Sequence, residues 1–108
     1  MSYKVEILPS AWDDLKSIED YYALEFDVST AIDVSDSILD KIELLETNPD
    51  IGNDTPDSWL NKRGYRMLIC EKHVAIYKKI DTTIYIYHIF DIRRDYTKLF
   101  KKNIKDMK

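Results

Sequence analysis

The sequence predicts an α+β domain in which one antiparallel sheet packs against a pair of helices. Three observations favour this class. A short alternating segment comes first, two apolar stripes at helical spacing follow it, and three stretches rich in β-branched and aromatic residues follow the stripes. Because 108 residues correspond to one ordinary domain, we expect residues 1–108 to form a single domain.

The first two expected elements are a strand and a helix. Apolar and polar residues alternate over residues 3–8, which is typical of a half-buried strand. Ser10 is the expected N-cap of the helix that follows, with Asp13 and Asp14 in its first turn. One face of this helix carries an apolar stripe made of Ala11, Leu15, Ile18 and Tyr22.

A second helix is expected after a polar break at residues 27–30. Its apolar stripe consists of Ala31, Val34, Ile38, Ile42 and Leu45. Asn48 ends the helix, because the residue before a proline is pushed out of the helical region. The two helices therefore form a hairpin, and the turn-forming residues at 48–61 make a long loop after it.

Three strands and a short helix complete the expected order. The strands span residues 64–70, 73–80 and 83–91, and the two-residue breaks between them predict a meander of consecutive hairpins. A final run from Tyr96 to about Lys105 predicts a short C-terminal helix. The simplest arrangement packs the helical hairpin against one face of the sheet.

Composition restricts location and chemistry. No apolar stretch approaches the roughly 20 residues that span a bilayer, and residues 1–4 lack the apolar core of a signal peptide. Cys70 is the only cysteine, so it cannot form an intramolecular disulfide, and we expect it to pack as a small buried apolar residue. A cytoplasmic protein without membrane partners is therefore expected.

Charge is distributed unevenly along the chain. The net charge is −4, but acidic residues dominate up to Pro56 and basic residues dominate beyond Asp57. Such a division is compatible with a local positive surface for an anionic partner and equally with ordinary solvated faces. Both interpretations stay open at this point.

The order of elements and several short motifs resemble the RelE/ParE toxin superfamily of type II toxin–antitoxin systems. The motifs recur in the same order over nearly the whole chain. They lie at residues 3–7, 11–15, 18–22, 42–45, 48–52, 64–66, 76–78 and 93–96. This resemblance implies the fold class described above and a cognate antitoxin as partner.

The resemblance also implies two possible targets. RelE-type toxins are ribosome-dependent endoribonucleases that cut mRNA, whereas ParE-type toxins inhibit DNA gyrase and serve in plasmid stabilisation. The long helical hairpin, the loop at residues 49–52 and the net acidity favour the ParE branch. We therefore expect a ParE-like growth inhibitor acting on DNA gyrase. The alternatives are a RelE-like mRNA interferase that binds the ribosome with mRNA, and a non-toxic binding module that retains the fold.

Four residues are candidates for catalysis if the protein is a ribonuclease. Arg66 occupies the family's Gly-Tyr-Arg motif, whose arginine contacts phosphate in ribonuclease members, and a guanidinium can bind two phosphate oxygens at once. Arg93 and Arg94 occupy the family's basic motif after the last strand. Tyr96 is suited to acid–base work or to stacking on a base.

Each candidate also has a structural explanation. Arg66 would be a strand arginine paired with a carboxylate, and Tyr96 would pack at the start of the last helix. One arginine at residues 93–94 would pair with Asp91 or Asp95. For a functional role, we expect the guanidinium groups at residues 66 and 93–94 to share one hollow.

Departures from the ribonuclease pattern weaken that alternative. RelE-type ribonucleases place lysines just before the Gly-Tyr-Arg strand, where this chain has Asp57 and Trp59, with Lys62 and Arg63 nearby. Whether the protein is an enzyme therefore stays open.

We expect no cofactor and no metal. His73 and His88 are far apart in the chain, and neither has a Cys or carboxylate at ligand spacing. Strand alternation predicts that His88 is a buried histidine on the face that carries Ile84, Ile86 and Phe90.

Overall fold

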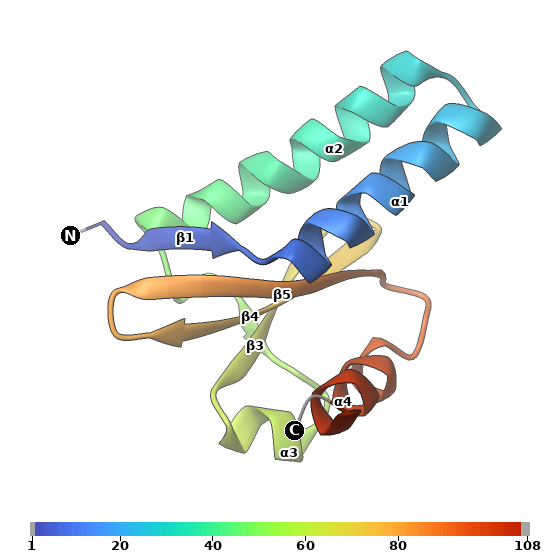
Figure 1. Ribbon diagram of the computed structural model, residues 1–108. Helices are drawn as coiled ribbons and strands as arrows, with labels where there is room; N and C mark the ends of the chain where they lie inside the picture. Colours follow the sequence, from blue (N-terminus) through green and yellow to red (C-terminus); the bar gives the residue numbers. More distant parts are fainter. Residues whose placement is uncertain (1, 107–108) are drawn as a thin grey trace.

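A helical hairpin, a five-stranded sheet and two shorter helices form three stacked layers within residues 2–106, the part of the chain that the computed structural model describes (Figure 1). The elements, in chain order, are β1 (Lys4–Ile7), α1 (Pro9–Glu25), α2 (Val28–Glu43), the 3-10 turn η1 (Leu44–Glu46), β2 (Asn53–Asp54), α3 (Ser58–Lys62), β3 (Tyr65–Cys70), β4 (His73–Ile80), β5 (Thr83–Asp91) and α4 (Tyr96–Asp106). The predicted α+β class is confirmed. Met1 and residues 107–108, which the predicted domain includes, lie outside the described residues.

The three predicted strands form the centre of the sheet. The strand order is β1-β5-β4-β3-β2, and β3, β4 and β5 pair antiparallel as consecutive hairpins. The first residue of each hairpin turn, Glu71 and Asp81, has a positive φ of 60° and 56°. The predicted meander is therefore confirmed.

The two remaining strands lie at the edges of the sheet. β1 runs parallel to β5, with Lys4 opposite Thr83, so the sheet as a whole is mixed. β2 has two residues and pairs with β3, with Asp54 opposite Arg66. The long loop after the hairpin thus contributes a short edge strand and the helix α3.

The core has one cluster on each face of the sheet. The larger lies under the hairpin, as predicted, and its buried residues are Ala11, Leu15, Ile38, Ile42, Leu45, Leu68, Cys70, Ala75, Tyr77, Ile84, Ile86 and Ile89. The smaller lies under α3 and α4, and its buried residues are Leu60, Val74, Ile76 and Phe100. Because β4 alternates between the two clusters, it is buried on both faces.

The start of α1 differs from the prediction. Leu8 is the N-cap and Pro9 the first helical residue, a position that suits proline because the N–H it lacks would have no helical partner. Ser10 is not the cap, since its hydroxyl donates to the carbonyl of Tyr87 at 2.6 Å. Asp13 and Asp14 accordingly lie beyond the first turn.

An irregularity in β5 overturns the predicted face of His88. Ile76 pairs with His88 but Tyr77 pairs with Ile86, so the register shifts by one residue. Ile84 and Ile86 belong to the cluster under the hairpin, as does Ile89. His88 instead stacks on Phe90, with ring centroids 5.4 Å apart, and Phe90 belongs to the other cluster.

None of the helices within residues 2–106 combines the length and apolar character needed to cross a bilayer.

Candidate functional site

A hollow of about 450 Å³ opens between α1 and the end of β5. It is lined by Asp14, Ser17, Ile18, Tyr21, Tyr22, His73, Ile89, Phe90, Asp91, Arg93 and Arg94. Its wall is therefore largely apolar and aromatic, and its two arginines follow β5 directly.

A second hollow of about 290 Å³ adjoins the first beneath the outer half of the hairpin. It is lined by Tyr22, Phe26, Thr30, Val34, Ser37, Ile38, Cys70, Glu71, Lys72 and His73. Tyr22 and His73 line both hollows, so the two hollows are neighbours, and we call them together the hairpin groove. Burial lowers the pKa of His73, which favours the neutral ring at pH 7, and this ring meets Tyr22 edge to face at 6.1 Å.

The turn between α1 and α2 exposes several large apolar side chains. Leu24 is 86% exposed, Phe26 64% and Val28 66%, and Tyr21 and Ile32 are about half exposed. We call these five residues the hairpin tip. Figure 1 shows the turn at the far end of the hairpin, where it projects beyond the sheet.

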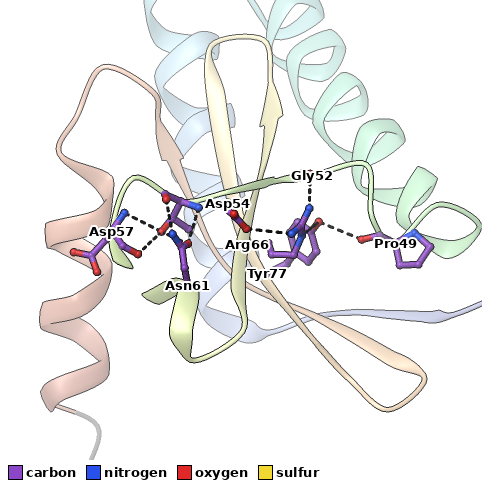
Figure 2. A network of polar contacts seen from close by, with 8 residues as sticks. Pro49, Gly52, Asp54, Asp57, Asn61, Arg66 and Tyr77 are labelled. Atoms are coloured by element: carbon purple, nitrogen blue, oxygen red, sulfur yellow. Dashed lines mark hydrogen bonds and ion pairs between the residues drawn. The ribbon is translucent and has the colours of Figure 1, made fainter. Parts of the chain in front are cut away.

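Arg66 ties the long loop to the sheet (Figure 2). Its Nη2 donates to the carbonyl of Gly52 at 2.6 Å, and its Nη1 lies 3.3 Å from Oδ1 of Asp54. Its Nε donates to the hydroxyl of Tyr77 at 3.4 Å, and this hydroxyl donates to the carbonyl of Pro49 at 3.2 Å. This is the structural explanation considered above, a strand arginine paired with a carboxylate.

A second network holds α3 in place (Figure 2), and one of its members, Asp57, connects α3 to α4. The side chain of Asn61 accepts from the backbone N–H and the hydroxyl of Thr55, both at 2.8 Å, and donates to its carbonyl. Asp57 caps α3 by accepting from the N–H of Leu60. Its other oxygen lies 2.9 Å from Nζ of Lys101 in α4, and this hydrogen bond lowers the pKa of Asp57.

Sequence reasoning missed this network, although a signal was present. Asp57 stands at the N-cap of a short helix, three residues before Leu60, which is the spacing at which an aspartate side chain caps a helix. Its pairing with Lys101 had no such local signal because the two residues are 44 positions apart.

Arg93 and Arg94 lie together beside the hairpin groove. Arg93 contacts Asp91 through Nε at 3.1 Å and through Nη2 at 2.8 Å, and this pairing lowers the pKa of Asp91 to about 2. The salt bridge considered as a structural explanation is therefore present. Arg94 is exposed, and in the described part of the chain no carboxylate lies within 4.0 Å of its guanidinium.

Tyr96 packs at the start of α4. Its hydroxyl lies 3.5 Å from the sulfur of Met67, and its ring contacts the core cluster under α3 and α4. This position matches the packing role expected of a tyrosine that begins a C-terminal helix.

The structure does not bring the candidate residues into one hollow. Arg93 and Arg94 line the hairpin groove, but Arg66 is not among the residues that line it. The expectation of a shared hollow is wrong, because Arg66 lies on β3 beside the edge strand β2, whereas the pair follows β5 on the other side of β4.

The two remaining titratable candidates are structural. His88 Nδ1 lies 2.8 Å from Oδ2 of Asp14, which also accepts from the N–H of Ile89, so the ring has a hydrogen-bond partner, although His88 is half-buried and not buried as predicted. Cys70 is buried, which raises the pKa of its thiol to about 11. Within residues 2–106 no group of three or more His, Cys, Asp or Glu is placed to hold a metal ion.

Known proteins resemble this chain in fold. A chain of the chromosomal ParDE TA system from P. aeruginosa is 20% identical, with a TM-score of 0.73 over 85% of this chain and 98% of that chain. A chain of the toxin–antitoxin complex RelBE2 from Mycobacterium tuberculosis is 15% identical, with a TM-score of 0.62 over 84% of this chain and 99% of that chain.

Sequence comparison identifies the family. A search of curated proteins gave no match to the chain. The family model described as ParE toxin of type II toxin-antitoxin system, parDE, matches residues 5–96, which include every element from β1 to the start of α4. This protein therefore belongs to the ParE toxin family of type II toxin–antitoxin systems.

Proposed function

We propose that this protein arrests growth by binding DNA gyrase, and that a cognate antitoxin neutralises it by occupying the hairpin groove. Membership of the ParE family supports the target, because ParE-type toxins inhibit gyrase. The observation that carries the proposal is the exposed apolar hairpin tip. A role in plasmid stabilisation and a cytoplasmic location are consistent with this target and stay predictions.

The hairpin tip has the character of a protein-binding surface. A group of exposed apolar side chains that lie close together marks an interaction site on many soluble proteins. Leu24 and Val28 belong to neither core cluster, and their exposed fractions are 86% and 66%. Burial of a large apolar side chain contributes about 1.5–3 kcal/mol, so loss of these two side chains should weaken the affinity for gyrase by tenfold or more.

The hairpin groove suits a segment of an antitoxin. Its wall is partly apolar, and the cations Lys72, Arg93 and Arg94 line it together with the carboxylates of Asp14, Glu71 and Asp91. A helix or strand with apolar anchors and an acidic residue facing Arg94, whose guanidinium has no carboxylate partner among the described residues, would fit both features. Because Tyr21 and Phe26 line the groove region and also belong to the hairpin tip, an occupant of the groove would restrict access of gyrase to the tip.

The dispersal of the candidate catalytic residues supports an inhibitor over a ribonuclease. Cleavage of RNA requires groups that converge on one phosphate. Here Arg66 holds the loop at Gly52, Arg93 pairs with Asp91, and Tyr96 packs on Met67.

Two variants separate the functions. We expect Leu24→Glu/Val28→Ser, the tip variant, to require at least tenfold more protein to inhibit DNA supercoiling by purified gyrase, with antitoxin binding retained. Ile80→Glu is the matched control, because Ile80 is an exposed apolar residue remote from the hairpin tip, at the end of β4 where it pairs with Thr83. Arg94→Ala should leave gyrase inhibition unchanged.

Growth experiments give the opposing outcomes. The chain is induced alone in bacteria, and mRNA ends and DNA breaks are mapped. Ribosome-dependent mRNA cleavage that Arg94→Ala abolishes, without any effect on gyrase, would overturn the proposal in favour of a ribonuclease. Absence of any growth defect would instead indicate a non-toxic binding module.

A further inference from the structure

The two helical layers carry opposite charge. α1 and α2 together contain nine Asp and Glu residues and two Lys. On the other side of the sheet, α3, α4 and the neighbouring part of β4 carry six basic residues whose side chains are described, which we call the basic face: Lys62, Arg63, Lys78, Lys98, Lys101 and Lys102.

Direct contacts place three of these cations, Arg63, Lys78 and Lys101, on one surface, and Lys62, Lys98 and Lys102 are exposed residues of α3 and α4. Figure 1 shows α3 and α4 side by side beneath the sheet, and Lys101 bridges them through Asp57 at 2.9 Å. The guanidinium carbon of Arg63 lies 3.6 Å from the ring centroid of Trp59, and Nζ of Lys101 lies 5.7 Å from it. Nζ of Lys78 lies 4.9 Å from the ring of Tyr65, which packs in the same cluster as Trp59.

Most of this charge is not neutralised within the molecule. Lys62, Lys98 and Lys102 are exposed, and among the described residues no carboxylate lies within 4.0 Å of their amino groups. Lys101 is the one member that forms an ion pair in that part of the chain. Three exposed lysines on two neighbouring helices therefore remain available to a partner.

The basic face lacks the apolar centre of a protein interface. Leu60 and Phe100 are buried at 0% and 1% exposure, and the other large apolar residues of α3 and α4 are half-buried, so none of those described is exposed: Trp59, Tyr96, Leu99 and Ile104. Protein interfaces have an apolar core with charges at the rim, whereas nucleic-acid interfaces are polar and strongly positive. The hairpin tip has the first character and the basic face has the second.

We propose that the basic face binds the phosphate backbone of duplex DNA, without sequence preference. Single-stranded nucleic acid is less suited, since its binding depends on aromatic rings free to stack on bases. Here Arg63 covers the ring of Trp59 and Lys78 lies over that of Tyr65. The proposal does not depend on gyrase as the target and is tested without it.

The net charge of −4 does not oppose this binding. Helices on opposite faces of a sheet have axes roughly 20 Å apart, because each layer adds about 10 Å. The Debye length is about 8 Å at 0.15 M salt, so the acidic hairpin is screened from a ligand on the basic face.

The test is binding of the full chain to a fluorescent 30-base-pair duplex, measured by anisotropy from 50 to 200 mM salt. We expect Lys62→Gln/Lys98→Gln/Lys102→Gln, the lysine variant, to bind at least tenfold more weakly at 50 mM salt. The slope of log K against log salt should fall in magnitude by about 2.7, because each lost phosphate contact contributes about 0.9. Lys16→Gln/Lys41→Gln/Lys72→Gln removes the same charge from the hairpin side and should bind like the unchanged protein.

Three outcomes would overturn the proposal. The first is absence of salt-dependent binding to the duplex, and the second is equal weakening by both triple variants, which would reflect net charge alone. The third is preferential binding of single-stranded RNA or of an acidic polyglutamate peptide to the basic face. None of these outcomes alters gyrase inhibition by the purified chain, so failure here is distinguishable from failure of the proposed function.

Discussion

Gly52 is the residue at which the long loop meets the sheet. A Cβ at this position would overlap the hydroxyl of Tyr77 and lie 2.7 Å from the carbonyl of Met67. The backbone approaches this closely because Arg66 Nη2 binds the carbonyl of Gly52 at 2.6 Å. The missing side chain of Gly52 thus lets the loop backbone lie against Tyr77 while its carbonyl accepts from Arg66.

Gly52→Ala is expected to lower the free energy of unfolding by about 1–3 kcal/mol, because the loop must move away from Tyr77 to admit the methyl group. Urea denaturation followed by circular dichroism measures the change. Asp50→Ala, at an exposed position of the same loop, is the control and should have little effect. Equal stability of the Gly52→Ala protein and the unchanged protein would contradict the close approach.

Asp91 makes stability depend on pH. Its pKa is about 2 in the folded protein, below the ordinary aspartate value of 3.8, because Arg93 hydrogen-bonds its carboxylate. A lowered folded pKa contributes stability that is present above pH 4 and is lost as pH falls towards 2. The contribution is modest, since the side chain of Arg93 is 82% exposed.

We therefore expect Asp91→Asn to be less stable than the unchanged protein at pH 6, with the difference shrinking as pH falls from 4 to 2. Chemical denaturation at several pH values measures this difference. Glu71→Gln changes an exposed acid and serves as the control for general charge effects. A difference that stays constant across the range would mean that Asp91 does not titrate as described.

At the scale of elements, the local sequence pattern correctly predicted which helices and strands exist. The two helical stripes and the three strands lie where the sequence places them, because periodicity reflects which side of an element is buried. The ends of these elements, and the face of the sheet on which a given side chain lies, were less predictable. The register shift between β4 and β5 reverses the face of His88, and no residue in β5 signals it.

The helix α4 is held mainly by one side chain. Phe100 is 1% exposed and meets the rings of Tyr65 and Tyr87 edge to face, at 5.1 and 6.0 Å. Lys101 adds the ion pair with Asp57 on the adjacent helix. The aromatic contact dominates, because burial of a ring contributes several times more than a partly exposed ion pair.

Phe100→Ala should destabilise the protein by about 3–5 kcal/mol, through lost burial and a cavity that the sheet cannot fill. Thermal and urea unfolding measure the loss, with Lys98→Ala on the exposed side of α4 as control. Should the unfolded fraction become too large to measure, Phe100→Leu retains most of the volume and should show a smaller loss. Full stability of both Phe100 variants would indicate that α4 does not pack as described.

On the scale of the whole molecule, the sheet separates two surfaces of different character. The acidic hairpin, with its apolar tip and groove, lies on one face, and the basic face lies on the other (Figure 1). Because the separation exceeds the Debye length, substitutions on one surface should not affect binding at the other.

This separation predicts that each of the two variants loses one activity and keeps the other. The tip variant should lose gyrase inhibition and bind the DNA duplex normally, whereas the lysine variant should lose duplex binding and retain affinity for the antitoxin. Anisotropy with the duplex and calorimetry with the antitoxin measure both affinities in both variants. Loss of both activities in either variant would show that the surfaces are coupled or that the fold is damaged, which circular dichroism would distinguish.

The site was less predictable than the fold. The resemblance identified Arg66, Arg93, Arg94 and Tyr96 as candidates, but their partners could not be read from the chain. Gly52, Asp54 and Tyr77 reach Arg66 from 11 to 14 positions away, through a loop and a neighbouring strand. Asp91, two positions from Arg93, was the one carboxylate partner anticipated correctly.

The sequence by itself determined the α+β class, the helical hairpin, the meander and the family resemblance, since each depends on residues close together in the chain or on their order. Only the tertiary structure decided that β1 pairs parallel with β5, that Arg66 lies apart from Arg93 and Arg94, and that acidic and basic helices occupy opposite faces. These features depend on strand order and register, which arise from contacts between distant segments and leave no periodic signal in either one.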